Sequence, residues 1–209
     1  MKNVLGGTKM HLLFQGDSIT DADRLFYPEY HGYGRGYVGM IAKELIPYGH
    51  QITNKGVNGN RAEELIKRWD RDCIRLHPDV VTILIGVNEI WTGMDGGMKT
   101  TAEQFAKNLE FLIKETIDKT GAKIILMEPF VFPYPAERLL WRPQLDEEIQ
   151  VVRELARAYQ TRLVCLDGIF AKACIEHSFD ELTIDGVHLT KLGHHMVKEA
   201  WLKEFLQQS

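Results

Sequence analysis

The sequence has few cysteines and no long apolar run. Its three cysteines, Cys73, Cys165 and Cys174, are an odd number without CxxC spacing. They fit thiols in a reducing compartment better than a disulfide framework. No stretch approaches the roughly 18 apolar residues that a membrane-spanning helix needs. Residues 1–18 lack the uncharged apolar core of a signal peptide. We therefore expect a cytoplasmic protein that does not bind membranes.

The sequence also lacks an excess of positive charge. With a net charge of -4 it offers no broad basic surface for nucleic acid. The glycine-containing stretch Met94–Met98 has neither phosphate-binding motif, GxGxxG or GxxxxGK[ST], and is predicted to be a flexible loop. The eight histidines show no recognised metal-ligand spacing, and His194 is expected to be structural. We therefore expect no metal, no cofactor and no nucleic-acid partner.

Short apolar runs alternate with longer amphipathic stretches. This alternation predicts repeated βα units and one three-layer α/β/α domain over residues 1–209. The sheet should have five parallel strands in the flavodoxin-like order 2-1-3-4-5. The expected strands are His11–Phe14, Gln51–Asn54, Val80–Ile85, Lys123–Met127 and Leu163–Leu166. The expected helices are Gly36–Leu45, Ala62–Arg75, Thr101–Lys119, Gln144–Gln160 and Leu192–Leu206. The charges between Glu63 and Arg71 predict a solvated helix face.

Ser18 follows the first expected strand in the segment LLFQGDSITD. It should therefore lie at the carboxyl edge of the sheet, where open α/β sheets bind ligands. Gly-Asp-Ser is also common turn chemistry, and a structural turn is the stronger interpretation of this tripeptide alone.

Asp185 and His188 lie three residues apart, just before the last expected helix. A serine hydroxyl needs a base within hydrogen-bond reach, and the base needs an acceptor that fixes its tautomer. One rigid turn with the pattern DxxH can supply both groups. Alternatively, Asp185 caps a turn and His188 is a surface residue.

Four short blocks together resemble the SGNH (GDSL-like) hydrolases. They are GDSIT, GVNGN, GVNE and DGVHLTKLGH, and they span residues 14–194 in the order found in that family. The resemblance implies that Ser18 is the nucleophile, His188 the base and Asp185 its orienter. It also implies an oxyanion hole built from the Ser18 and Gly59 N–H groups and the Asn88 amide. Such donors stabilise the negative charge that develops during acyl transfer.

Two positions depart from the pattern of the family. Glu89 follows Asn88 where an aspartate is usual, so the contacts of that carboxylate are expected to be rearranged. The sequence is most similar to small bacterial carbohydrate acetylesterases that act on xylan or xylo-oligosaccharides. In those esterases an aromatic residue is expected before the aspartate, and here that position is Ile184.

A proline-rich aromatic segment follows the fourth expected strand. We hypothesise that its Phe130 and Trp141, together with Trp91, wall the acyl or sugar pocket. The equally good alternative is that these rings pack the segment onto the core or a subunit interface.

The sequence predicts a cofactor-free serine esterase for short acyl esters, with O-acetyl groups on carbohydrate as first choice. A lysophospholipase or thioesterase is the alternative with the same chemistry. A non-catalytic flavodoxin-like module for FMN or a nucleotide is the alternative from another class. The resemblance also favours a homo-oligomer.

Overall fold

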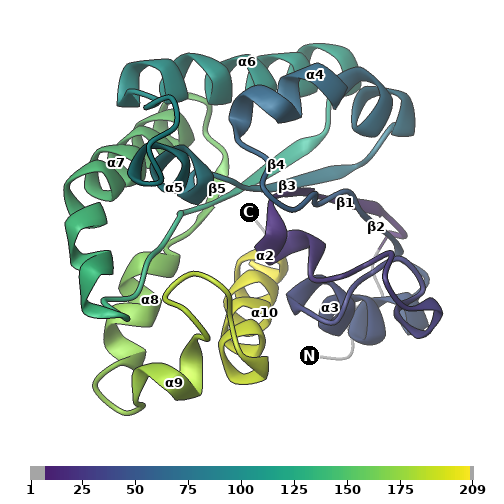
Figure 1. Cartoon of the computed structure of the whole chain (residues 1–209). Helices are drawn as coiled ribbons and strands as arrows, with labels where there is room; N and C mark the ends of the chain where they lie inside the picture. Colours follow the sequence, from purple (N-terminus) through teal and green to yellow (C-terminus); the bar gives the residue numbers. More distant parts are fainter. Residues whose placement is uncertain (1–7, 208–209) are drawn as a thin grey trace.

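The computed structural model describes residues 8–207 and contains the predicted parallel sheet (Figure 1). Five strands pair in the order β2-β1-β3-β4-β5, and every pairing is parallel. The predicted order 2-1-3-4-5 is confirmed. The strands are β1 (His11–Gly16), β2 (Gln51–Asn54), β3 (Val80–Leu84), β4 (Lys123–Met127) and β5 (Arg162–Val164).

Helices cover both faces of the sheet, as the three-layer prediction requires. In Figure 1, α4 and α6 lie above the sheet and α3 and α10 lie below it. The long helices are α3 (Tyr37–Leu45), α4 (Ala62–Asp72), α6 (Ala102–Thr120), α7 (Arg142–Ala158) and α10 (Lys191–Leu206). The shorter ones are α2 (Ser18–Asp21), α5 (Val87–Met94), α8 (Leu166–Ala173) and α9 (Phe179–Leu182). Four 3₁₀ segments are η1 (Pro28–Tyr30), η2 (Ile46–Tyr48), η3 (Ile74–Leu76) and η4 (Ala136–Trp141).

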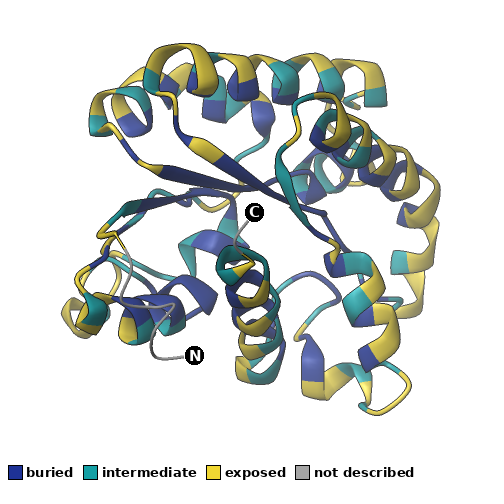
Figure 2. Ribbon diagram, turned by 180° about the vertical axis from the view of Figure 1, so that it is seen from behind, coloured by how far each residue is buried: buried dark blue, intermediate teal, exposed yellow. Residues whose placement is uncertain are grey.

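The sheet lies between two apolar clusters because its side chains alternate between faces. Leu12 and Phe14 of β1 belong to the cluster that lies between the sheet and the helices α3 and α10. Leu13 belongs to the cluster between the sheet and the helices α4 and α6. Figure 2 shows the result, with dark, buried strands and helices that expose only their outer faces. On one face the Trp201 ring packs 5.1 Å from that of Phe14, and its Nε1 donates to Thr82 Oγ1 at 2.9 Å. A rigid central sheet therefore supports the loops at its carboxyl edge.

Several boundaries differ from the prediction for local reasons. Leu166, expected in the fifth strand, is fully buried as the first residue of α8. The helix α5 was not predicted, because its eight residues are too few to display a helical period. The helix expected at Thr101–Lys119 corresponds to α6 (Ala102–Thr120), and Gly121 ends it in the left-handed conformation with φ of 68°.

Two expectations concern the ends of the chain and the membrane. The prediction that residues 1–18 contain no signal peptide falls partly on residues 1–7, which lie outside the described residues. Between residues 8 and 207, no helix is long and apolar enough to cross a membrane.

Candidate active site

Ser18 lies at the carboxyl end of β1, as predicted. The strand ends at Gly16, Asp17 caps the next helix, and Ser18 is the first residue of α2. The Asp17 Oδ1 accepts the N–H of Ile19 at 2.9 Å, which fixes the turn. A Cβ on Gly16 would lie 2.4 Å from the carbonyl oxygen of Leu84, so only glycine lets β1 and β3 approach here. Local sequence and sheet packing thus aim one hydroxyl at the sheet edge.

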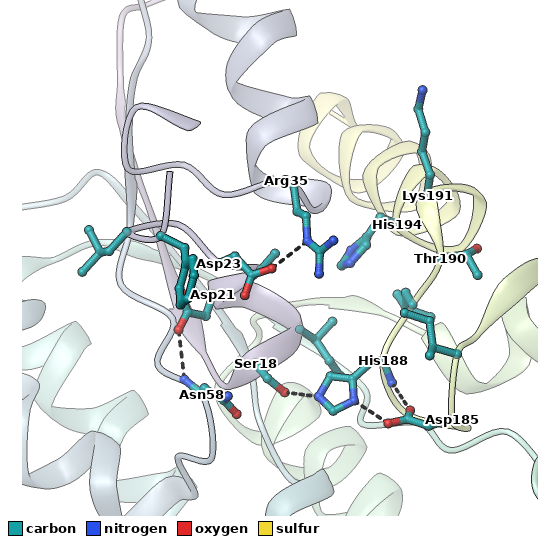
Figure 3. A pocket seen from close by; sticks show the side chains of 16 residues that line it. Ser18, Asp21, Asp23, Arg35, Asn58, Asp185, His188, Thr190, Lys191 and His194 are labelled. Atoms are coloured by element: carbon teal, nitrogen blue, oxygen red, sulfur yellow. Dashed lines mark hydrogen bonds and ion pairs between the residues drawn. The ribbon is translucent and has the colours of Figure 1, made fainter. Parts of the chain in front are cut away.

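Ser18, His188 and Asp185 form a continuous hydrogen-bonded chain (Figure 3). The Ser18 hydroxyl lies 2.9 Å from His188 Nε2, and His188 Nδ1 lies 2.7 Å from Asp185 Oδ2. Since an ionised Asp185 can only accept, the neutral imidazole carries its proton on Nδ1. Nε2 is then free to accept the proton of Ser18, which is the arrangement that a general base needs.

The turn itself holds Asp185 in place. Its Oδ1 accepts the N–H groups of Val187 at 3.0 Å and His188 at 2.8 Å. Partial burial raises the pKa of Asp185, but the hydrogen bonds from the His188 ring and these two N–H groups outweigh it and lower the pKa below its usual value. Asp185 therefore stays ionised and can orient the imidazole.

Gly59 and Asn88 reach the same edge from the segments that follow β2 and β3: Gly59 lies in a loop and Asn88 in the first turn of α5. Gly59 has a φ of 78°, and a Cβ there would meet no atom within 4 Å. This conformation favours glycine over any residue with a side chain. Asn88 Nδ2 donates to the carbonyl oxygen of Asn60 at 3.0 Å, which orients the amide and leaves its second hydrogen available.

The unusual Glu89 turns inward, beneath the loop of Gly59. Its side chain is 1% exposed, and Oε1 accepts the N–H of Ala62, the first residue of α4, at 2.7 Å. Asn88 and Glu89 thus attach α5 to the segment 60–62 at two successive positions. The Glu89 side chain is longer than the aspartate usual at this position, and its carboxylate still bonds the segment 60–62.

Arg68 shows that the predicted solvated face of α4 is partly wrong. Its side chain is only 10% exposed, because it points beneath the Gly59 loop. The guanidinium donates to Asn60 Oδ1 and to Gln15 Oε1, both at 2.9 Å. The sequence of α4 does not show that Asn60 and Gln15 lie within reach of Arg68. The pattern of charged residues therefore predicted that Arg68 faces the solvent.

The predicted aromatic wall is only partly present. Phe130 is 1% exposed and packs against Phe132 and Phe170 in the core, so its assignment to the pocket wall is wrong. Trp141 is also buried. It contacts Trp91 and lies under the guanidinium of Arg138, 3.9 Å from its ring centroid. Trp91 does reach the site, with its ring 5.8 Å from that of His188.

A cavity of about 780 Å³ opens beside Ser18 and His188 (Figure 3). Its polar lining includes Asp21, Asp23, Arg35, Asn58 and Lys191, and its apolar lining includes Leu25, Phe26 and Ile184. None of these was predicted as a site residue. Asp21 and Asn58 lie within the GDSITD and GVNGN segments, whose position at the sheet edge was a usable signal. Arg35 and Lys191 carry no comparable signal, since the tertiary structure alone brings their segments together.

His194 also faces this cavity, but it is largely buried, in agreement with the structural role expected for it. Its Nδ1 accepts the N–H of Tyr37 at 3.2 Å, and burial lowers its pKa to about 4. Among residues 8–207, no group of three or more histidine, cysteine or acidic side chains is arranged to hold a metal ion.

Solved structures resemble this chain over nearly its whole length. The structure of a putative GDSL-like lipase from Parabacteroides merdae has a TM-score of 0.89 and 33% identity, covering 96% of this chain and 97% of that one. The acetylxylan esterase Axe2 from Geobacillus stearothermophilus has a TM-score of 0.86 and 30% identity, covering 97% and 96%. Catalytic mutants of Axe2 replace a serine, an aspartate and a histidine by alanine.

Sequence comparison gives the same relationship. The acetylxylan esterase of Geobacillus stearothermophilus is 31% identical over 209 aligned residues, which cover 95% of this chain and 94% of the relative. The model of the GDSL-like lipase/acylhydrolase family matches residues 14–196. The chain therefore belongs to the GDSL-like lipase/acylhydrolase family and is a carboxylic ester hydrolase.

Proposed function

We propose that this hydrolase removes short acyl groups, in particular acetyl groups on carbohydrate, through a Ser18–His188–Asp185 triad. The observation that carries the proposal is the hydrogen-bonded chain from Ser18 Oγ through both nitrogens of His188 to Asp185. In this mechanism Ser18 attacks the ester carbonyl while His188 takes its proton, and Asp185 stabilises the imidazolium. His188 then protonates the leaving alcohol and activates the water that releases the acid.

The oxyanion would be bound by the N–H groups of Ser18 and Gly59 and by the amide of Asn88. These donors belong to the three segments that follow β1, β2 and β3 at one edge of the sheet. The Asn88 amide is already oriented by Asn60, so little reorganisation is needed when charge develops.

The composition of the cavity supports a hydroxyl-rich leaving group. Carboxylate, guanidinium, amide and ammonium groups on its walls offer both acceptors and donors to a polyol. Trp91, packed against His188, favours a small acyl group on that side. The similarity to an acetylxylan esterase points to the same chemistry.

A lysophospholipase or thioesterase remains the second candidate because of the apolar rim. Leu25 and Phe26 line the cavity and are 76% and 75% exposed, and an alkyl chain could cover them. A series of 4-nitrophenyl esters separates the two candidates. A rate that falls from acetate to longer acyl chains supports the acetylesterase, and a rate that rises supports the lipid or thioester substrate.

The first test is hydrolysis of 4-nitrophenyl acetate by the wild type and by Ser18→Ala. We expect kcat to fall by several orders of magnitude while circular dichroism shows an unchanged fold. Ser178→Ala is the matched control, because Ser178 bonds only within the first turn of α9 and should leave kcat unchanged. Equal rates for wild type and Ser18→Ala would remove Ser18 as the nucleophile. Release of acetate from acetylated xylo-oligosaccharide then tests the substrate.

We also propose a single cytoplasmic domain that self-associates. The three free cysteines fit a reducing compartment, and the family match spans most of the chain. Light scattering tests the self-association, and a monomeric mass would contradict it.

A further inference from the structure

Two buried carboxyl groups lie behind the proposed oxyanion hole. Glu89 of α5 is 1% exposed and Glu148 of α7 is fully buried. The two helices are in contact (Figure 1). Neither residue takes part in the proposed proton transfers. Burying one carboxylate is costly, and burying two close together is more costly still.

Each carboxyl group has one satisfied and one unsatisfied oxygen. Glu89 Oε1 accepts the N–H of Ala62, and Glu148 Oε1 accepts from Gln144 Nε2 at 3.0 Å. Among the described residues, Oε2 of both side chains is buried without a hydrogen-bond partner. An ionised carboxylate would bury a negative charge with one of its two oxygens unsolvated, whereas a protonated carboxyl group carries no charge. The pattern of contacts therefore favours protonated side chains.

The unsatisfied oxygen of Glu148 lies at the base of α5. A Cβ on Gly86, the residue that precedes α5, would be 3.0 Å from Glu148 Oε2. Gly86 has a φ of 140°, so the turn that starts the helix depends on glycine at this point. Charge on Glu148 would therefore act directly on the start of the helix that carries Asn88.

We propose that Glu89 and Glu148 are positioning residues that hold Asn88 and the Gly59 loop in place only while at least one carboxyl group of the pair stays protonated. This inference rests on the proposed function, since it assigns the pair to the oxyanion donors of that mechanism. Asn88 and Glu89 bond to Asn60 and Ala62, on the C-terminal side of Gly59. Repulsion between two charged carboxylates would move α5 and break this alignment, which catalysis needs to within a fraction of an ångström.

The charged groups around the pair do not neutralise it. Glu89 faces Asp17 from the β1–α2 turn and Arg61 from the start of α4, but the Arg61 guanidinium is already bonded to Glu64. Glu148 faces Glu89 and its neighbour Glu147. Burial raises the pKa of Glu89 to about 8, and burial together with the charge of Glu89 raises the pKa of Glu148.

The pH dependence of kcat distinguishes this role from that of the triad. A general base acts in its deprotonated form, so the triad alone predicts a plateau of activity at alkaline pH. Because the repulsion needs a charge on both residues, the buried pair instead predicts that kcat declines at alkaline pH once Glu148 ionises as well as Glu89, with little change in KM. The two variants Glu89→Gln and Glu148→Gln remove the ionisation but keep the size of the side chain.

The experiment measures kcat and KM for 4-nitrophenyl acetate from pH 6 to 9.5, with the buffer rate subtracted. We expect Glu148→Gln to keep kcat at pH 7 within about twofold and to shift the alkaline decline upward by at least about one pH unit. Glu89→Ala should lower kcat about tenfold at every pH through loss of the Ala62 contact, and Glu89→Gln should restore it. Glu154→Gln, an exposed change on α7, is the matched control and should follow the wild type.

Other outcomes of these measurements would contradict either the inference or the proposed function. Identical pH profiles for the wild type and Glu148→Gln would overturn the inference, as would a large loss of kcat at pH 7 in a folded Glu148→Gln. If these variants do not fold, infrared spectroscopy of the wild type gives the answer. The carbonyl band of a protonated carboxyl group must then disappear over the same pH range in which kcat falls. If wild-type activity does not depend on Ser18, the proposed function fails instead, independently of these variants.

Discussion

Arg68 Nε donates to Asn60 Oδ1 at 2.9 Å and so attaches the helix α4 to the loop that carries Gly59. The same guanidinium reaches Gln15 at the end of β1, two residues before Asp17 and three before Ser18. One side chain therefore connects the end of β1, which leads to Ser18, with the loop that carries Gly59. Its burial makes any substitution costly, because its acceptors would lose their partner.

We predict that Arg68→Met lowers kcat about tenfold or more, because the Gly59 loop loses its anchor. Stability should fall by about 2 kcal/mol as buried acceptors become unsatisfied. Arg71→Met is the control, because Arg68 and Arg71 both pair with Asp72. The Arg71 side chain, however, is 74% exposed and does not bond Asn60. Urea unfolding and ester kinetics check both values. Equal effects of the two substitutions on kcat would contradict the anchoring role.

Asp185→Asn should lower kcat by about 10⁴-fold with the fold preserved. The amide would donate to His188 Nδ1 and drive the imidazole proton to Nε2, where it can no longer accept the proton of Ser18. Ester kinetics measure the loss. Asp180→Asn, an exposed change on α9, should leave kcat unchanged. A loss below about tenfold would mean that Asp185 does not set the tautomer.

Asn88→Ala should reduce kcat by about 10²–10³-fold with a smaller change in KM, since the amide acts mainly on the charge of the transition state. Asn108→Ala on α6 serves as the control, because Asn108 bonds only Gln104 of its own helix. Steady-state kinetics with 4-nitrophenyl acetate separate kcat from KM. An increase in KM alone would place Asn88 in ground-state binding instead.

Stability should depend on pH through His194. Its pKa is lowered from 6.5 to about 4 by burial, so between these values the unfolded chain binds a proton that the folded chain excludes. The contribution of His194 to the free energy of unfolding is therefore fully present above pH 6.5 and is lost as the pH falls toward 4.

We predict that the stability of the wild type relative to His194→Gln decreases by up to about 3 kcal/mol between pH 7 and pH 4. Glutamine cannot ionise but can still accept the N–H of Tyr37. Urea unfolding at several pH values gives the difference, in which the contributions of other groups cancel. A difference that does not vary with pH would show that His194 is protonated alike in both states.

Local patterns in the sequence, together with the family resemblance, were enough to predict the layers, the strand order and the three residues that the structure joins in one hydrogen-bonded chain. The continuous apolar stretches of β3 and β4 indicate strands covered on both faces, as in a parallel sheet between two layers of helices. Asp17 fixes the turn before Ser18 through a hydrogen bond to the N–H of Ile19, two residues away, so this part of the geometry is local. Asp185 and His188 are three residues apart, so one turn joins them wherever it lies in space.

The burial of individual side chains at the site depends on contacts between residues far apart in the sequence, and only the tertiary structure shows it. Phe130 and Trp91 are both aromatic residues near the same edge, yet one packs in the core and the other against His188. Arg68 and Lys67 are adjacent charges on one helix, yet only Arg68 turns inward, because Asn60 and Gln15 are within its reach. The turns that carry Ser18, Asp185 and His188 could be predicted from short motifs, since most of the hydrogen bonds that shape them join residues within a few positions. Only the folded chain decided which side chains are buried against them, since burial depends on segments far apart in the sequence.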